Sequence, residues 1–300
     1  MPELPDVTVY VEALERHVVG RRLERVRLAS ASLLRTVEPP LSAAFGRRAV
    51  GVARLGKRIV LALEGELYLV LHLMIAGRLR WRPKDVALPA KRAHAAFDFE
   101  HGTLLLTEAS PKKRATLHVV QGAAGLAEHD RGGLEVEAAS LGAFAAALTR
   151  ERHTLKRALT DPTLFSGIGN AYSDEILHRA RLSPLQLTTN LDASEVERLY
   201  EATRATLREW TERLRREVGE GFPEKVTAFR EGMAVHGRHR EPCPDCGAPV
   251  QRIVRGENES NYCARCQTGG RLLADRALSR LLTEDWPRTL EEMEARRRGA

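Results

Sequence analysis

The sequence of 300 residues has little that would place it in a membrane or outside the cell. It contains no run of eighteen apolar residues, so no segment is expected to span a bilayer. Its first twenty residues mix Glu, Asp and Arg with apolar positions, which is unlike a secretory signal. Aromatic residues make up only 5% of the chain, which argues against extensive base stacking on Phe, Tyr or Trp. We therefore expect a cytoplasmic protein without a membrane segment.

Cysteine is also scarce, and all four cysteines form one pattern. The sequences CPDC and CARC are two C-x2-C pairs that are sixteen residues apart. Two disulfides or a redox pair are alternatives, but disulfides are rare in the cytoplasm and redox motifs rarely come in matched pairs. This spacing is typical of zinc ribbons, in which four thiolates surround one metal ion. The expected ligands are Cys243, Cys246, Cys263 and Cys266.

Basic residues are in excess, with 47 Lys and Arg against 40 Asp and Glu, which gives a formal charge of +7. Such an excess favours a polyanionic partner, most often a nucleic acid, although it also serves solubility. A segment in the middle of the chain strengthens this interpretation. In DPTLFSGIGNAYSDEIL, Gly167 and Gly169 flank a tight turn that opens into a helix near Asn170. Backbone N–H groups at a helix start favour an anion, although a helix junction without a ligand is the simpler alternative.

The order of the predicted elements indicates an α+β chain of about two domains. Apolar residues recur at helical spacing over residues 6–19. Short strand-like runs follow, namely RIVLAL, ELYLVLHL, GRLRW, AAFDFE and TLLLT, with a hairpin turn at Glu64 and Gly65. From Leu141 the pattern is helical, and Ser194 and Glu197 predict a capping box for the longest helix. The residues from Ala274 onward predict two short helices.

The chain starts with Met-Pro-Glu. Removal of Met1 would give Pro2 a free secondary amine, which is a nucleophile, beside the carboxyl group of Glu3. Together with LGKRIVL, HLMIAGRL, LKRALTD…GIGNAYSDEIL and CPDC…YCARCQ, which occur in this order, this start resembles the formamidopyrimidine-DNA glycosylase / endonuclease VIII family of base-excision repair enzymes. The resemblance extends over about residues 2–270. It implies a catalytic β-sandwich domain with a leading helix over residues 1–130, a helix–two-turn–helix domain over 140–240, a zinc-finger hairpin over 241–272 and a C-terminal helical extension over 273–300.

The resemblance implies that Pro2, Glu3 and Lys57 are catalytic. In the family, the N-terminal proline amine attacks C1′ of the damaged nucleotide, a Schiff base forms, the base leaves and the strand is cut by β-elimination. An α-amino group titrates near pH ~8, so part of it is neutral at cellular pH. Glu3 matches the acid that protonates the sugar ring oxygen. Lys57 matches a lysine that approaches the flipped nucleotide; without the resemblance it would be interpreted as a solvated lysine at a strand end.

The resemblance also implies damaged DNA, duplex or partly single-stranded, as the partner of a monomeric, nucleoid-associated enzyme. The four cysteines then hold a structural zinc ion, because no ligand position stays open for a substrate. His72 matches a phosphate-contacting histidine, although a lone histidine is more often structural. The residues expected to contact DNA are His72, Ile75, Lys112, Lys113, Arg114, Lys156, Asn170 and Asn258.

Three departures from the family bear on the substrate. Asn258 stands where the finger usually carries an arginine that grips phosphates, and Arg255 is three residues earlier, so δ-elimination is left open. Ile75, next to Met74, replaces the methionine that fills the emptied stack, and SPKKRATL replaces an Arg-Phe-Gly loop. The base-capping segment GEGFPEKVTAFREGMAV shows little of the usual 8-oxoguanine clasp. The expected lesion is therefore an oxidised or ring-opened base that is not specified further.

Two other functions remain open at this point. A non-catalytic binder of damaged or branched DNA would explain the missing finger arginine and aromatic wedge. An RNA-binding protein of the translation apparatus would also use a helix–two-turn–helix and a zinc ribbon. The Pro-Glu start favours the enzyme, because a binding module has no need of a nucleophile beside an acid.

Overall fold

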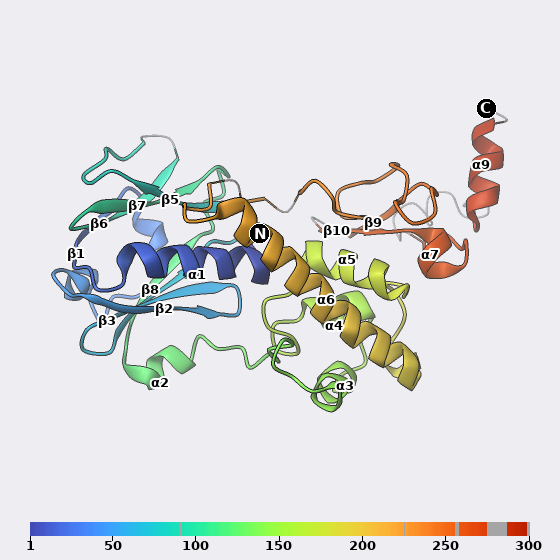
Figure 1. Ribbon diagram of the computed structural model, residues 1–300, viewed down its shortest axis with the longest axis horizontal. Helices are drawn as coiled ribbons and strands as arrows, with labels where there is room; N and C mark the ends of the chain where they lie inside the picture. Colours follow the sequence, from blue (N-terminus) through green and yellow to red (C-terminus); the bar gives the residue numbers. More distant parts are fainter. Residues whose placement is uncertain (90–91, 225, 228, 256–257, 275–286, 299–300) are drawn as a thin grey trace. The chain divides into compact units, whose positions relative to one another are not determined.

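The computed structural model describes residues 1–89, 92–224, 226–227, 229–255, 258–274 and 287–298 (Figure 1). The chain divides into two compact units. Unit 1 consists of Met1–Gly132 and Glu209–Ala228, and unit 2 of Gly133–Arg208 and Phe229–Ala300. Among the described helices, none combines the length and the apolar composition needed to cross a membrane.

Unit 1 is built from two four-stranded antiparallel sheets, with strand orders β1-β6-β7-β5 and β2-β3-β4-β8. Figure 1 draws β5, β6 and β7 of the first sheet above helix α1, and β2, β3 and β8 of the second sheet below it. Buried side chains of α1 and of both sheets form one continuous hydrophobic core. The strands are β1 (Leu23–Leu28), β2 (Ala49–Leu55), β3 (Arg58–Leu63), β4 (Leu67–His72), β5 (Gly77–Arg82), β6 (Ala93–Phe99), β7 (Gly102–Glu108) and β8 (Thr116–Gln121), and the short helix α2 (Gly122–Ala127) follows.

Helix α1 (Leu4–Val18) begins two residues before the predicted start at Asp6. Pro5 is placed in the first turn, where its missing N–H costs nothing. Glu3 and Asp6 form a reciprocal capping box, in which the Glu3 N–H donates to Asp6 Oδ2 at 3.0 Å. The apolar spacing therefore predicted the helix, while the cap that fixes its first residue was missed.

The chain after helix α6 (Ala193–Val218) returns onto unit 1. Arg215 pairs with Glu12 of α1 at 2.6 Å, and Arg16 of α1 donates to the carbonyls of Gly219 and Gly221. These contacts attach the last turns of a long helix to the helix that follows the N-terminus.

Unit 2 contains most of the helices and the second hairpin. Its helices are packed around buried apolar residues such as Phe144, Leu155, Phe165 and Ile176. The elements are α3 (Leu141–Thr149), α4 (Leu155–Thr160), α5 (Asn170–Ala180), most of α6, β9 (Gln251–Arg255), β10 (Asn258–Tyr262), α7 (Ala264–Thr268) and α9 (Leu290–Arg298).

The capping box predicted at Ser194 and Glu197 is wrong. The backbone N–H of Glu195 donates to Asp192 Oδ1 at 2.8 Å, and the Asp192 N–H donates to Glu195 Oε2 at 3.2 Å. Asp192 therefore caps α6, and Ser194 donates its hydroxyl to the same carboxylate. Of the two helices predicted after Ala274, α9 is present, and residues 275–286 lie outside the described residues.

Candidate active site and nucleic-acid interface

The first residues of the chain are packed into unit 1 ahead of α1. Pro2 is buried, and Glu3 exposes 2% of its surface. Burial is the largest influence on the Met1 amine and lowers its pKa below the usual value. Nearby carboxylates raise this pKa and nearby cations lower it further; in decreasing order, the charges are those of Glu3, Arg78, Asp6 and Lys57. The net effect is an N-terminal amine that loses its proton more easily than it would in water.

Lys57 occupies the two-residue turn between β2 and β3. Gly56, the other residue of the turn, has a φ of +60°, which glycine adopts at little cost. The charge of Lys57 acts both on the N-terminal amine and on the His72 imidazole. The structure thus brings the three residues predicted to be catalytic into one region of unit 1.

His72 ends β4, where it pairs with Arg58 of β3 and Thr116 of β8. Burial lowers the pKa of His72 to about 4, and the cations Arg58 and Lys57 contribute to the shift. At neutral pH the imidazole is therefore uncharged, and it can serve a phosphate only as an N–H donor.

This pKa predicts how stability depends on pH. The pKa of His72 is near 4 in the folded protein and 6.5 in the unfolded chain. Between pH 4 and pH 6.5, the unfolded chain therefore binds a proton that the folded protein does not. The free energy of unfolding should therefore fall as pH drops from 6.5 towards 4, with a maximum slope from His72 of about 1.4 kcal/mol per pH unit. The variant His72→Gln should lose less stability over this window.

Urea denaturation of both proteins from pH 8 to pH 4 measures this difference. At pH 8 the imidazole is neutral in both states, so the comparison there isolates the packing cost of the substitution. A difference between the two proteins that stays constant over the whole range would show that His72 does not titrate as described.

The residues expected to fill the emptied base stack lie at two exposed turns of unit 1. Ile75 exposes 55% of its surface in the turn between β4 and β5, next to Met74, whose φ is +51°. The loop after β7 exposes Lys112 and Arg114. Both turns therefore present side chains to solvent, which agrees with the predicted contacts without testing them.

The base of this loop is held by a buried carboxylate. Glu108 accepts the backbone N–H groups of Arg114 at 3.0 Å and Ala115 at 3.1 Å. The imidazole of His94, which is fully buried in β6, lies 3.0 Å from the same carboxylate. The anchor fixes where the basic loop begins and ends, although its tip is in solvent.

Lys156 and Asn170, both predicted to contact phosphate, are already hydrogen-bonded within unit 2. Lys156 Nζ lies 2.5 Å from Asp174 Oδ1 and donates to the Asn170 carbonyl at 2.6 Å. Asn170 Nδ2 donates to the carbonyl of Glu259 in β10 at 2.7 Å. These bonds join α4, the start of α5 and the finger hairpin, so they orient the helix start that the sequence predicted.

Sequence reasoning missed the two acidic residues that organise this region. Asp174 is buried and also lies 2.8 Å from His236 Nδ1, so it bridges His236 and Lys156. Glu175 accepts the backbone N–H groups of three successive residues, Ala234, Val235 and His236, at 2.7–2.9 Å. The signal in the sequence was an acidic pair in an otherwise uncharged first half of a helix.

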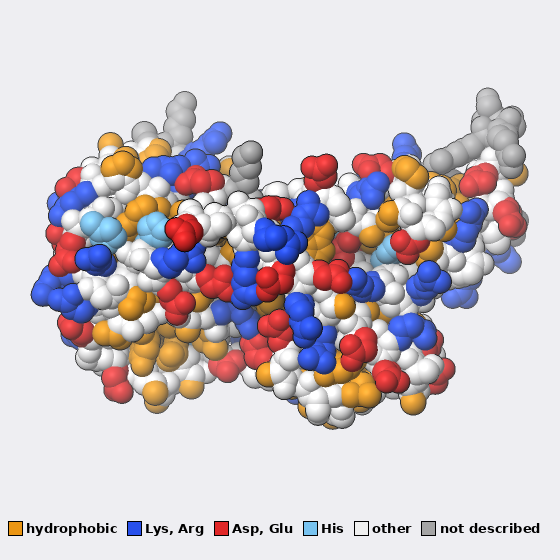
Figure 2. All heavy atoms as spheres, in the orientation of Figure 1, with side chains coloured by type: hydrophobic (Ala, Val, Ile, Leu, Met, Phe, Trp, Pro, Cys, Tyr) orange, Lys and Arg blue, Asp and Glu red, His pale blue; other side chains and the backbone are white. Residues whose placement is uncertain are grey.

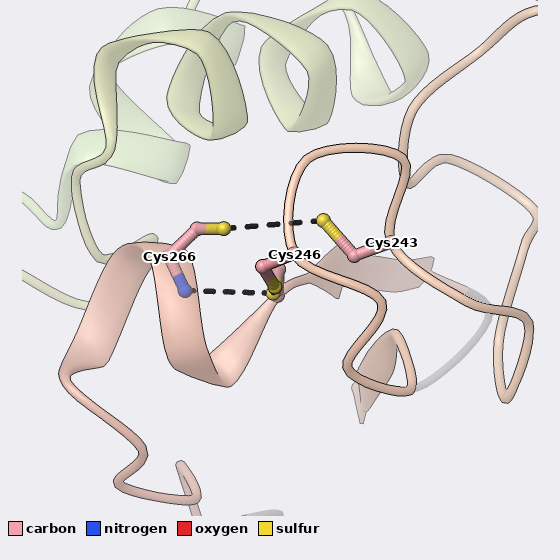
Figure 3. A group of neighbouring side chains, drawn as sticks. Cys243, Cys246 and Cys266 are labelled. Carbon is pink, nitrogen blue, oxygen red and sulfur yellow. Dashed lines mark hydrogen bonds between the residues drawn. The ribbon is translucent and has the colours of Figure 1, made fainter.

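The four cysteines converge as the spacing predicted. Their sulfur atoms all lie within 4.8 Å of one another. Cys243 Sγ and Cys266 Sγ are 3.9 Å apart (Figure 3), and Cys246 Sγ and Cys263 Sγ are 3.4 Å apart. Cys243 and Cys246 belong to a tight turn, and Cys263 and Cys266 belong to the start of α7. Four thiolates fill a tetrahedral site, so the chain holds a structural zinc ion.

The finger is supported from both sides. His178 of α5 lies with Nε2 3.3 Å from Cys243 Sγ, and Gln267 of α7 donates to the Leu182 carbonyl at 2.8 Å. The C-terminal extension adds Leu290 and Met293 of α9 to the small apolar core of the finger. The described part of the extension therefore packs on the zinc finger.

Asn258 pairs with Arg255 where β10 meets β9. The side chains of both residues lie outside the described part of the chain, so the contact predicted for Asn258 stays a prediction. Over the face shown in Figure 2, Lys and Arg side chains alternate with Asp and Glu among the described residues.

Comparison with known proteins identifies three matching family models. The formamidopyrimidine-DNA glycosylase N-terminal domain matches residues 1–115, the H2TH domain of the same glycosylase matches residues 134–218, and a zinc finger found in FPG and IleRS matches residues 240–269. Formamidopyrimidine-DNA glycosylases of Heliobacterium modesticaldum and Burkholderia thailandensis are 33% and 34% identical to the chain, over 89% of the chain and all of each relative.

Solved structures share the fold. A complex of Lactococcus lactis Fpg with DNA containing an abasic site matches 89% of the chain and 99% of the solved chain, with a TM-score of 0.77 and 23% identity. A complex of MutM with DNA containing carbocyclic 8-oxo-G matches 89% of the chain and all of the solved chain, also with a TM-score of 0.77 and 23% identity.

Proposed function

The chain belongs to the formamidopyrimidine-DNA glycosylase family, and we propose that it is a DNA glycosylase with AP-lyase activity in base-excision repair. It removes an oxidised or ring-opened base and cuts the strand by β-elimination. The observation that carries this proposal is the packing of Pro2 and Glu3 beside the charges of Lys57 and Arg78, where an N-terminal amine loses its proton easily.

The chemistry assigns one role to each catalytic residue. Once Met1 is removed, the lone pair of the Pro2 amine forms a bond to C1′ of the damaged nucleotide. The electrons of the glycosidic bond leave with the base, and the attached nitrogen loses its proton. Its lone pair then opens the C1′–O4′ bond while Glu3 gives a proton to the departing ring oxygen. The resulting Schiff base withdraws electrons, so loss of a proton from C2′ expels the 3′ phosphate. Lys57 holds the nucleotide near the amine.

DNA is held mainly through its phosphates. The catalytic domain, residues 1–130, contributes His72 and Lys57, and the helix–two-turn–helix domain, residues 140–240, contributes Lys156 and Asn170. The zinc finger, residues 241–272, contributes Asn258, and the described part of the extension, residues 273–300, supports the finger through Leu290 and Met293. Because phosphate contacts release counterions, binding should weaken steeply with salt.

The gap left by the extruded base is filled by Ile75 and by the basic loop of Lys112, Lys113 and Arg114. These side chains wedge a duplex less completely than an aromatic ring would, and unstacking costs a few kcal/mol. We place the enzyme in the cytoplasm, associated with the nucleoid, as a monomer.

The test is incubation of the protein with duplex DNA that contains a single abasic site, with and without borohydride. A nick at the site and, with borohydride, a covalent adduct of protein and DNA are expected. An otherwise identical duplex without the abasic site is the control. Tight binding to the abasic duplex without a nick or an adduct would reject the lyase and favour a non-catalytic binder of damaged DNA.

A further inference from the structure

Arg78 makes an unusual set of contacts at the start of β5. Its Nε donates to the Val226 carbonyl at 2.5 Å, and its Nη1 donates to the carbonyls of Gly77 at 2.7 Å and Ile75 at 3.1 Å. One guanidinium thus joins the turn that carries Ile75 to a residue 148 positions further along the chain. Three carbonyls accept its N–H groups, and none of them neutralises its charge.

Val226 belongs to the segment that follows α6, which we call the post-helix segment (Phe222, Glu224 and Val226). Val226 is 6% exposed and belongs to the core of unit 1. Phe222 packs edge-on against the ring of His17 of α1, with ring centroids 5.7 Å apart. Glu224 forms a bidentate ion pair with Arg82 of β5, at 2.7 and 3.0 Å. Two arginines of one strand, Arg78 and Arg82, therefore fasten this segment to the sheet.

The same Arg78 charge acts on the N-terminal amine. Four charged groups face this amine: Glu3, which caps α1, Asp6 in the first turn of α1, Lys57 of the β2–β3 turn and Arg78 of β5. Arg78 exerts the larger influence of the two cations. Its charge opposes the two carboxylates, which raise the pKa of the amine. After Met1 is removed, the amine moves one residue to Pro2, which is buried at the same place.

We propose that Arg78 is a positioning residue that couples the post-helix segment to the N-terminal nucleophile, by binding the Val226 carbonyl and by holding a positive charge beside the amine. The inference rests on the proposed function, in which this segment lies in the stretch that matches the family's base-capping region. When the segment is in place, the guanidinium is fixed by three carbonyls, and its charge helps to lower the pKa of the amine. When the segment is displaced, Arg78 loses the Val226 carbonyl and keeps only the acceptors of its own turn, the carbonyls of Gly77 and Ile75.

The proposal has a structural half, the binding of the Val226 carbonyl, and an electrostatic half, the positive charge beside the amine. Three variants separate them. Arg78→Gln removes both the charge and the fork of N–H donors. Arg78→Lys keeps the charge but cannot bind three carbonyls at once. Arg82→Gln is the matched control, because it releases Glu224 from the same segment and strand without being among the charges that act on the amine.

The first measurement needs no DNA. Reductive methylation of the N-terminal amine as a function of pH, followed by peptide mass analysis, reports how readily this amine loses its proton. The midpoint should move to higher pH in Arg78→Gln and stay unchanged in Arg78→Lys and Arg82→Gln. An unchanged midpoint in Arg78→Gln would overturn the electrostatic half of the proposal, whether or not the protein is a glycosylase.

The second measurement is the pH profile of borohydride trapping on abasic-site DNA, beside the excision of a damaged base. For Arg78→Gln we expect trapping to fall about tenfold at pH 6.5 and to recover towards pH 9, because one charge-assisted interaction is removed. For Arg78→Lys we expect a wild-type pH profile for trapping but slower base excision. If Arg82→Gln shifts the methylation midpoint and lowers trapping as Arg78→Gln does, Arg78 serves only to hold the post-helix segment on the sheet. If the wild-type protein forms no adduct, the proposed function fails, while the methylation result still decides the role of Arg78.

Discussion

A chain with a peptide extension ahead of Pro2 is expected to form almost no borohydride-stable adduct with abasic-site DNA. The extension converts the secondary amine into an amide, whose nitrogen lone pair is delocalised into the carbonyl group. The amines that remain are the α-amine at the far end of the extension, which is remote from the site, and the lysines, of which about one in a thousand is neutral at pH 7.4. The adduct yield at early times should therefore fall by roughly 1000-fold.

The matched control is the same extension followed by a protease site whose cleavage leaves Pro2 as the first residue. Cleavage should restore the adduct, and intact-mass analysis should show that the active chain lacks Met1. A variant Glu3→Gln separates the acid from the nucleophile: excision of a base should fall by about 10²–10⁴-fold, while trapping on a pre-formed abasic site should be less affected. An undiminished adduct on the extended chain would place the Schiff base on a lysine, with Lys57 as the first candidate.

Local patterns allowed much of this site to be predicted. The zinc ligands could be recognised because each C-x2-C pair lies in one short segment, a tight turn for Cys243 and Cys246 and the start of α7 for Cys263 and Cys266, whose geometry depends on few residues. The start of α5 at Asn170 followed from the glycines before it, and the β3–β4 hairpin followed from its turn. In each case the determining residues lie within a few positions of one another.

Contacts between distant segments could not be predicted in the same way. Strand β1 was missed because its Arg25 and Arg27 look like surface residues, whereas both bind the buried carboxylate of Asp98 in β6 at 2.7–2.9 Å. Arg78 has the sequence surroundings of an ordinary strand residue, and the Val226 carbonyl that accepts its N–H group lies 148 positions further along the chain. The physical reason is the same in both cases: a buried polar group needs a partner, and the sequence does not indicate which of many distant groups supplies it.

The zinc site predicts the second large effect. Removal of the metal, by a chelator or by Cys243→Ser, should release the finger from α5 and weaken binding to abasic-site DNA at least about 100-fold. The finger has a two-stranded hairpin and a five-residue helix, which are marginal without a metal. Structural zinc contributes about 10–16 kcal/mol to the folding of isolated zinc-finger peptides, far more than this small core supplies.

The loss of zinc also has a specific structural consequence. The Glu259 carbonyl of the hairpin accepts from the Asn170 side chain at the start of α5, and Gln267 donates to the Leu182 carbonyl just after α5, so these links depend on a folded finger. Limited proteolysis should therefore cut residues 240–272 and the extension in the metal-free protein, while unit 1 stays resistant.

Thiol titration makes the result easy to interpret, because the four cysteines of the chain are the four ligands and should all become reactive as one zinc ion is released. Asp245→Ala, which alters the exposed residue just before Cys246 without removing a thiolate, is the control and should retain zinc and DNA binding. If the metal-free protein keeps both its protease pattern and its affinity, the finger folds without zinc. The link between Asn170 and Glu259 would then be sufficient to hold the hairpin against α5.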